Sequence, residues 1–128
     1  MHVLNKEMNQ AFSAHVNTSC TKLEILDYIH DRGELSQPDL QASIGLDAAA
    51  ITRHLQQLKQ QELITTRKSE ADKRITLLSL TKLGEAELKE LWQRSEEFYQ
   101  KMTDDFSDAE IQALTDFIER IARNVHQK

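Results

Sequence analysis

The side chains best suited to chemistry are hydrogen-bonding groups in the middle of the 128-residue chain. One group is the run Arg67-Lys68-Ser69-Glu70-Ala71-Asp72-Lys73-Arg74, and another is a set of Thr, Arg and Gln residues between positions 49 and 57. Arg, Gln and Thr side chains can bond the edges of nucleic-acid bases, and Lys and Arg can pair with phosphates. The pattern therefore favours noncovalent recognition of nucleic acid.

Charge is distributed unevenly along the chain. Between Arg53 and Lys82, seven Lys and Arg residues stand against three Asp and Glu, a local net charge of +4, whereas the whole chain carries −5. The other segments together therefore carry −9, much of it in 85–97 and 104–119. A basic segment between acidic flanks can still attract phosphate, because affinity depends on the local field.

Patterns typical of catalysis are absent from the sequence. It has no Gly-rich phosphate loop, no nucleophile elbow and no His pair at i, i+3 or i, i+4. We therefore expect neither an enzyme nor a cofactor. A metal site bridging two subunits through Cys20, His15 and His30 is a weaker alternative, because structural zinc sites normally have clustered ligands.

Two short helices joined by a Gly-containing turn are predicted over residues 36–61. Ser36 caps the first, with Pro38 in its first turn, and Gly45 ends it. Asp47 caps the second, which runs from Ala48 to about residue 61. This arrangement is typical of a helix-turn-helix, in which the second helix enters a major groove of DNA.

The second of these helices is predicted to have one apolar and one polar face. Ile51, Leu55 and Leu58 recur at helical spacing and should face inward. The opposite face would read bases and holds Ala49, Thr52, Arg53, Gln56 and Gln57. His54 lies between the two faces, so it either contacts DNA or packs in a half-buried position.

A basic hairpin follows, with strands predicted over residues 63–67 and 75–80 and a short sheet bridge at Leu35. Arg74, near the tip, is expected to enter a minor groove. Asp72, two residues earlier, would orient an arginine or the turn. The remaining basic side chains of the wing are expected to contact phosphates: Arg67, Lys68 and Lys73.

The flanking segments are predicted to be helical, over about 4–16, 21–31, 82–102 and from a capping box at Ser107 and Glu110 onward. The first of these helices and the last two carry more apolar surface than a small winged domain can cover, which favours a homodimer. The predicted fold is mainly α with a small β-hairpin wing. One winged helix-turn-helix domain over 1–128 would comprise a DNA-binding lobe at 18–83 and dimerisation helices at 1–17 and 84–128.

Three features that the sequence lacks indicate where in the cell the protein is located. Its single cysteine excludes an internal disulfide, its first residues show no signal-peptide pattern, and no apolar run approaches bilayer length. We expect a soluble cytoplasmic protein without a membrane partner.

Several motifs resemble the MarR family of bacterial regulators. They are the segment from Gly45 to Leu55, the pair Leu63-Ile64, Asp72-Lys73-Arg74, and Leu80-Thr81-Lys82-Leu83-Gly84. The resemblance covers nearly the whole chain. It implies a dimeric winged-helix transcription regulator that binds a pseudo-palindromic operator and is often controlled by a small molecule or by oxidation. It also implies minor-groove contact for Arg74, with Asp72 in support.

Two positions depart from that pattern. Glu62 stands where the family often has Gly before the first wing strand, so the preceding helix must end without the residue that most easily adopts a left-handed conformation. Thr66 stands where an Arg often follows, and Arg67 comes one residue later. A shift of one residue in a strand points a side chain to the opposite face, so Arg67 is not expected to replace the missing Arg.

The sequence leaves other functional readings open. The acidic overall charge and Thr66 are compatible with a winged-helix protein-interaction module that does not bind an operator. Cys20, near a helix start, could instead make the chain a redox-sensing regulator, since a helix N-terminus can lower the pKa of a thiol. The main hypothesis is a repressor released by a small molecule or an oxidant.

Overall fold

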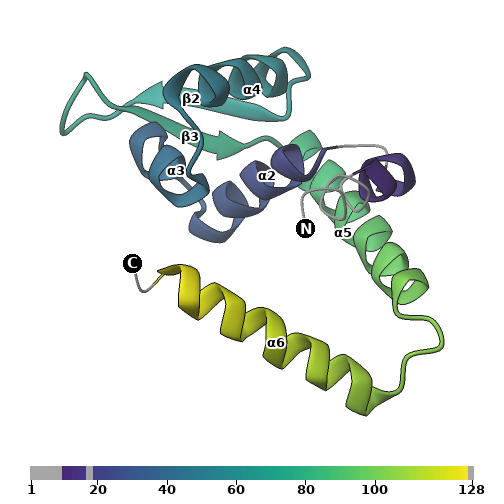
Figure 1. Ribbon diagram of the computed structural model, residues 1–128. Coiled ribbons are helices and arrows are strands. Elements are labelled where there is room, and N and C mark those ends of the chain that lie inside the picture. The colour runs from purple at the N-terminus through teal and green to yellow at the C-terminus, as the bar shows by residue number, and fades with distance from the viewer. Residues whose placement is uncertain (1–9, 17–18, 127–128) are drawn as a thin grey trace. The chain divides into compact units, whose positions relative to one another are not determined.

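The chain is mostly helical and contains one small sheet (Figure 1). The computed structural model describes residues 10–16 and 19–126. A short helix over 10–16 precedes α2 (Cys20–Arg32), β1 (Leu35–Ser36), α3 (Gln37–Ile44), α4 (Ala48–Gln60), β2 (Ile64–Lys68), β3 (Thr76–Leu80), α5 (Lys82–Met102) and α6 (Asp108–His126). The predicted fold class is confirmed.

The chain forms two compact units, residues 1–95 and 96–128, with the boundary inside α5. The predicted division into a lobe at 18–83 and dimerisation helices stays a prediction. Of the predicted first helix, residues 10–16 are helical and Val16 is buried, whereas Leu4 and Met8 lie outside the described residues. In the part of the chain that is described, no helix is long and apolar enough to cross a membrane.

Side-chain caps set the helix starts of the first unit. Ser19 caps α2 by accepting the Lys22 N–H at 3.1 Å. Ser36 caps α3 in the same way. Because such a cap satisfies an amide that the helix itself leaves without a partner, it fixes where the helix begins.

The sheet is antiparallel, with strand order β1-β3-β2. Leu35 pairs with Leu78 in β3, and β2 pairs with β3 from Ile64 opposite Leu80 to Lys68 opposite Thr76. The short bridge predicted at Leu35 is therefore present. Figure 1 shows the turn between β2 and β3 extending away from the neighbouring helices as a wing.

The core of the first unit gathers apolar side chains from all its major elements. α2, α3 and α4 contribute Ile25, Leu26, Ile29, Leu40, Ile51, Leu55 and Leu58, and the wing and α5 contribute Leu63, Ile64, Leu78, Leu88 and Leu91. Burial of one such side chain contributes about 1.5–3 kcal/mol. This core holds the polar face of α4 and the wing in one framework.

The second unit exposes an apolar stripe. Ser107 and Glu110 form the predicted capping box, since the Glu110 N–H donates to the Ser107 hydroxyl and the Ser107 N–H donates to the Glu110 carboxylate, at 3.1 and 2.8 Å. Large apolar side chains along α6 are 41–65% exposed: Leu114, Phe117, Ile118, Ile121 and Val125. An apolar helix face of this size normally has a partner.

A tight junction joins α4, the wing and α5. Glu62 ends α4 at φ +62°, with its N–H bonded to the Lys59 carbonyl and the Leu63 N–H bonded to the Leu58 carbonyl, both at 3.0 Å. These are the two bonds of a Schellman motif. The helix therefore ends in the left-handed conformation even though a glycine is missing.

On the other side of the junction, α5 begins against the backbone of Leu63. The Thr81 N–H donates to the Leu63 carbonyl at 3.0 Å, and the Thr81 hydroxyl donates to the Glu62 carbonyl at 2.7 Å while accepting the Gly84 N–H at 2.9 Å. A Cβ on Gly84 would lie 2.0 Å from the Leu63 oxygen. Only glycine permits this close approach.

Glu62→Gly should raise the free energy of unfolding above that of Glu62→Ala by about 1 kcal/mol, because only the alanine keeps the Cβ that strains a left-handed residue. Urea denaturation of both variants measures the difference. The alanine variant controls for loss of the carboxylate at the helix C-terminus. Equal stability of the two variants would contradict the strained cap.

Gly84→Ala should lower the free energy of unfolding by more than about 2 kcal/mol, because backbone atoms must move to admit the methyl group. Thermal and urea unfolding measure the loss. Ala86→Ser, at an exposed position on the same helix, is the control and should change stability by less than about 0.5 kcal/mol. A Gly84→Ala protein as stable as this control would disprove the close approach.

Candidate nucleic-acid interface

α4 presents a polar face to solvent. Ile51, Leu55 and Leu58 are buried, as the spacing predicted. All five residues predicted to read bases are exposed to solvent: Ala49, Thr52, Arg53, Gln56 and Gln57. The Asp47 carboxylate fixes the start of the helix by accepting the Ala50 N–H at 2.8 Å. The division of faces is confirmed, and base contact by these residues stays a prediction.

Two other positions on α4 bear on the interface. His54 is half-buried between the two faces, a position that suits packing, and DNA contact by this residue stays a prediction. Lys59 is exposed. It lies on the same face of the helix as Thr52, which precedes it by seven residues, and Gln56, which precedes it by three. Sequence reasoning missed Lys59, although that spacing was a usable signal.

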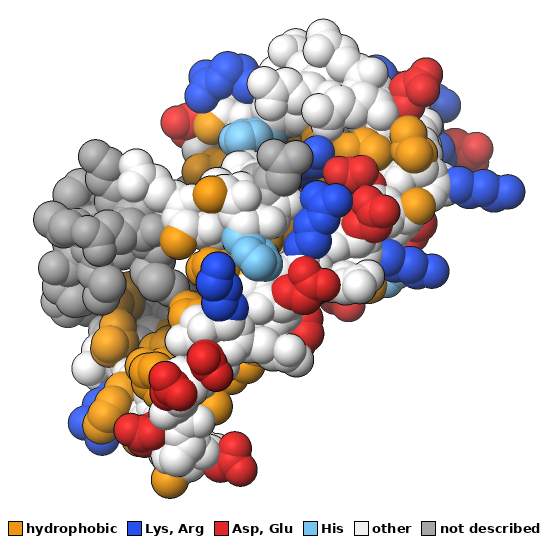
Figure 2. Space-filling view, turned by 90° about the vertical axis from the view of Figure 1, so that its right-hand side faces the viewer, with side chains coloured by type: hydrophobic (Ala, Val, Ile, Leu, Met, Phe, Trp, Pro, Cys, Tyr) orange, Lys and Arg blue, Asp and Glu red, His pale blue; other side chains and the backbone are white. Residues whose placement is uncertain are grey.

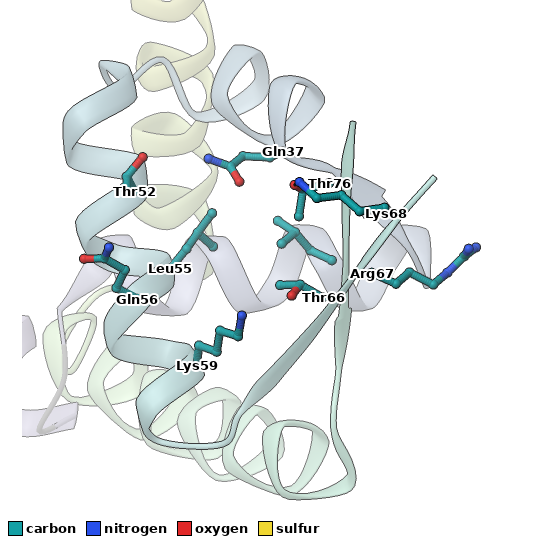
Figure 3. A pocket seen from close by; sticks show the side chains of 10 residues that line it. Gln37, Thr52, Leu55, Gln56, Lys59, Thr66, Arg67, Lys68 and Thr76 are labelled. Carbon is teal, nitrogen blue, oxygen red and sulfur yellow. The ribbon is translucent and has the colours of Figure 1, made fainter. Parts of the chain in front are cut away.

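A groove of about 370 Å³ lies between α4 and the wing (Figure 3). Its lining combines the apolar side chains of Leu55 and Leu78 with polar ones from α3, α4 and the strands: Gln37, Thr52, Gln56, Lys59, Thr66, Arg67, Lys68 and Thr76. In Figure 3, Lys59 and Leu55 point toward Thr66, whereas the Arg67 guanidinium points away from the groove. Thr66 and Arg67 thus lie on opposite faces of β2, as their positions in a strand predicted.

The wing tip carries a preformed arginine fork. The Arg74 Nε and Nη2 donate to the two carboxylate oxygens of Asp72 at 3.1 and 3.2 Å, and the Arg74 backbone N–H donates to Asp72 at 3.0 Å. The Arg74 side chain remains 91% exposed. These bonds hold the pKa of the Asp72 carboxyl below its ordinary value, chiefly through the side chain of Arg74. Asp72 therefore orients Arg74 without covering it, and DNA contact stays a prediction.

The other basic residues of the wing differ in what they contact. The Lys68 ammonium donates to the Thr76 hydroxyl at 3.0 Å and retains donors for a phosphate. Lys73 is exposed at the turn. Arg67 instead donates two bonds to the Glu34 carboxylate, at 2.7 and 2.8 Å. The pair lowers the pKa of Glu34 and raises that of Arg67, mainly through these hydrogen bonds.

Charge is mixed on one face of the molecule. Figure 2 shows one face on which Lys and Arg side chains are interspersed with Asp and Glu. Interspersed charges largely cancel beyond a Debye length of about 8 Å at physiological salt. On this face no single sign of charge dominates the field that a polyanion would meet.

Contacts across the first unit tie α5 to α2. The Trp92 indole N–H donates to Asp27 at 3.1 Å, and its ring meets His30 edge-on with centroids 5.1 Å apart. The His30 Nδ1 also lies 2.7 Å from a carboxylate oxygen of Glu85. Sequence reasoning did not predict these contacts, because His30 and Glu85 lie 55 positions apart and Asp27 and Trp92 lie 65 positions apart.

Cys20 is exposed, and its redox role stays a prediction. Partial burial and the nearby Glu24 carboxylate raise the pKa of the thiol, and a backbone hydrogen bond offsets only part of this. Among the residues that the structure describes, no cluster of His, Cys, Asp and Glu could hold a metal ion. A site that bridges two subunits through Cys20, His15 and His30 needs a second copy of the chain, so that alternative stays a prediction.

Comparison with known sequences identifies relatives. A family model described as the MarR family matches residues 19–76. The uncharacterized HTH-type transcriptional regulator YdgJ of Bacillus subtilis (strain 168) is 33% identical over 123 residues, which cover 96% of this chain and 75% of the relative. The HTH-type transcriptional regulator MhqR of the same organism is 23% identical over 124 residues, covering 97% and 85%.

Solved structures show the same fold. The transcriptional regulator PcaV from Streptomyces coelicolor has a TM-score of 0.86 at 21% identity, covering 99% of this chain and 95% of that one. A mutant of MarR from E. coli, solved in complex with operator DNA, has a TM-score of 0.83 at 19% identity, covering 94% and 89%.

Alkylation of Cys20 by iodoacetamide should be slower at pH 7.5 than that of the same residue in the urea-unfolded chain, because a raised pKa leaves less thiolate at neutral pH. The midpoint of the pH profile should lie above the ordinary thiol value of about 8.5. The unfolded chain is the control because it removes the local environment. Faster reaction in the folded protein would restore the redox hypothesis.

Proposed function

Because the chain belongs to the MarR family of transcription regulators, and not to an enzyme family, we propose that it is a homodimeric repressor that reads a pseudo-palindromic operator. The observation that carries this proposal is the pairing of an exposed polar helix face with a fixed arginine fork. α4 offers Thr, Arg and Gln side chains suited to base edges in a major groove. Arg74 is held open by Asp72 and suits a neighbouring minor groove.

Dimerisation is proposed from the uncovered apolar stripe of α6. Its five large side chains are at least 41% exposed, and a second copy of the same helix is a self-complementary partner for such a stripe. A dimer with two recognition helices would contact half-sites about 10 bp apart. The MarR structure with operator DNA supports the binding mode by analogy of fold.

Release by a small molecule is the regulatory part of the proposal. It rests on the family and on the structure of PcaV, which was solved in complex with its natural ligand. The raised pKa of Cys20 argues for a ligand rather than an oxidant as the signal.

Selection from a random duplex pool, followed by fluorescence anisotropy across a salt series, tests the proposal. We expect a palindromic winner that binds far more tightly than its scrambled sequence, with a steep loss of affinity as salt rises, because phosphate contacts release counterions. Weak binding that ignores sequence would contradict operator recognition and favour a protein-interaction module.

Arg74→Ala should weaken operator binding by about 1–3 kcal/mol and reduce the preference for A·T pairs flanking the half-sites. Lys68→Ala should instead weaken all sequences alike and reduce the salt slope by about 1. Anisotropy with operators that carry A·T or G·C flanks separates the two effects. Unchanged flank preference in Arg74→Ala would contradict a minor-groove role for the wing.

A further inference from the structure

An ion pair crosses the outer face of the sheet. Glu34 immediately precedes β1, and Arg67 lies in β2, with β3 between the two strands. Adjacent strands lie about 4.8 Å apart, so the two side chains bridge a backbone separation of about 10 Å. Both Arg67 bonds are short, with Nε and Nη2 at 2.7 and 2.8 Å from the two Glu34 oxygens.

The geometry of this pair sets it apart from an ordinary surface contact. A guanidinium that meets a carboxylate through two parallel bonds is fixed in direction as well as in distance. The Arg67 side chain is 54% exposed and that of Glu34 37% exposed. Pairs this exposed add little to the free energy of folding, so what the pair mainly provides is alignment.

The segment that holds Glu34 joins the sheet through few backbone pairs. Glu34 lies between α2 and α3, in the body of the domain. β1 pairs with the wing through only Leu35 and Ser36. The Glu34–Arg67 pair adds a direct link from this body to β2, the strand on the far side of β3.

We propose that Glu34 and Arg67 form a brace that positions the wing for DNA, so that Arg67 acts as a positioning residue rather than as a phosphate ligand. This inference rests on the proposed operator binding. With its guanidinium directed away from the groove between α4 and the wing (Figure 3) and bonded to a carboxylate, Arg67 sets the direction in which the hairpin presents Arg74.

The brace can be tested with one variant, Glu34→Gln. A change in charge alone and the loss of the brace predict opposite changes in its affinity for DNA. Glu34→Gln removes a negative charge from a DNA-binding surface, and it frees Arg67. If charge alone decided, the variant would bind DNA more tightly. If the brace positions the wing, the same variant binds more weakly.

We expect Glu34→Gln and Arg67→Gln each to weaken operator binding by about 3–10-fold, and the double variant to show no further loss, because either change breaks the same contact. The salt slope should stay unchanged. In an Arg74→Ala background each change should cost less affinity than in the parent protein, since the brace positions Arg74 along with the rest of the wing. Arg67→Lys, which keeps the charge but lacks the fork, should behave like Arg67→Gln.

Glu70→Gln is the matched control, because Glu70 is an exposed wing carboxylate that interacts with Arg67 only through its charge. It should bind the operator as tightly as the parent protein or more tightly. A Glu34→Gln protein that matches this control would overturn the brace. So would an Arg67→Gln protein whose salt slope falls by about 1, since that would make Arg67 a phosphate ligand.

Hydrogen exchange of the wing amides in the free protein tests the brace without DNA. Glu34→Gln should speed exchange across β2 and β3 relative to Glu70→Gln, and equal rates would overturn the brace. If the parent protein shows no preference for any duplex, the proposed operator binding fails and exchange alone decides the brace. If the parent protein binds and the variants match it, only the brace fails.

Discussion

The contact on which the interface depends is the approach of α5 to the backbone of Leu63. One carbonyl oxygen accepts the Thr81 N–H at 3.0 Å and leaves no room for a side chain at Gly84. Thr81 also holds the Glu62 carbonyl, so the end of α4, the start of the wing and the start of α5 meet within a few residues. A change in this junction would move α4 and the wing together.

The proposed binding surface depends on that junction. The buried stripe of α4 fixes which side chains face solvent, and the register of β2 against β3 fixes which wing residues face the groove. Asp72 then sets the direction of Arg74. DNA recognition of this kind needs rigid placement of few side chains, because major-groove and minor-groove contacts must form at once.

Local signals in the sequence predicted much of this arrangement. The caps at Ser36 and Asp47, the Ser107 and Glu110 box and the extent of α5 were readable because each depends on residues within a few positions. Contacts between distant positions were not. The Glu34–Arg67 pair joins residues 33 positions apart, and nothing near either residue indicates its partner. Glu62 was recognised as a departure, but its left-handed conformation is imposed by the junction and not by its own preference.

In the proposed mode of DNA binding, one surface of the protein reads a major groove with α4 and the adjoining minor groove with the wing. Dimethyl sulfate probing of the selected operator tests both at once, since the reagent methylates guanine N7 in the major groove and adenine N3 in the minor groove. We expect protection of guanine N7 in two half-sites about 10 bp apart and of adenine N3 in the flanks, with the adenine protection lost in Arg74→Ala. Protection confined to one groove, or none at all, would contradict this mode of binding.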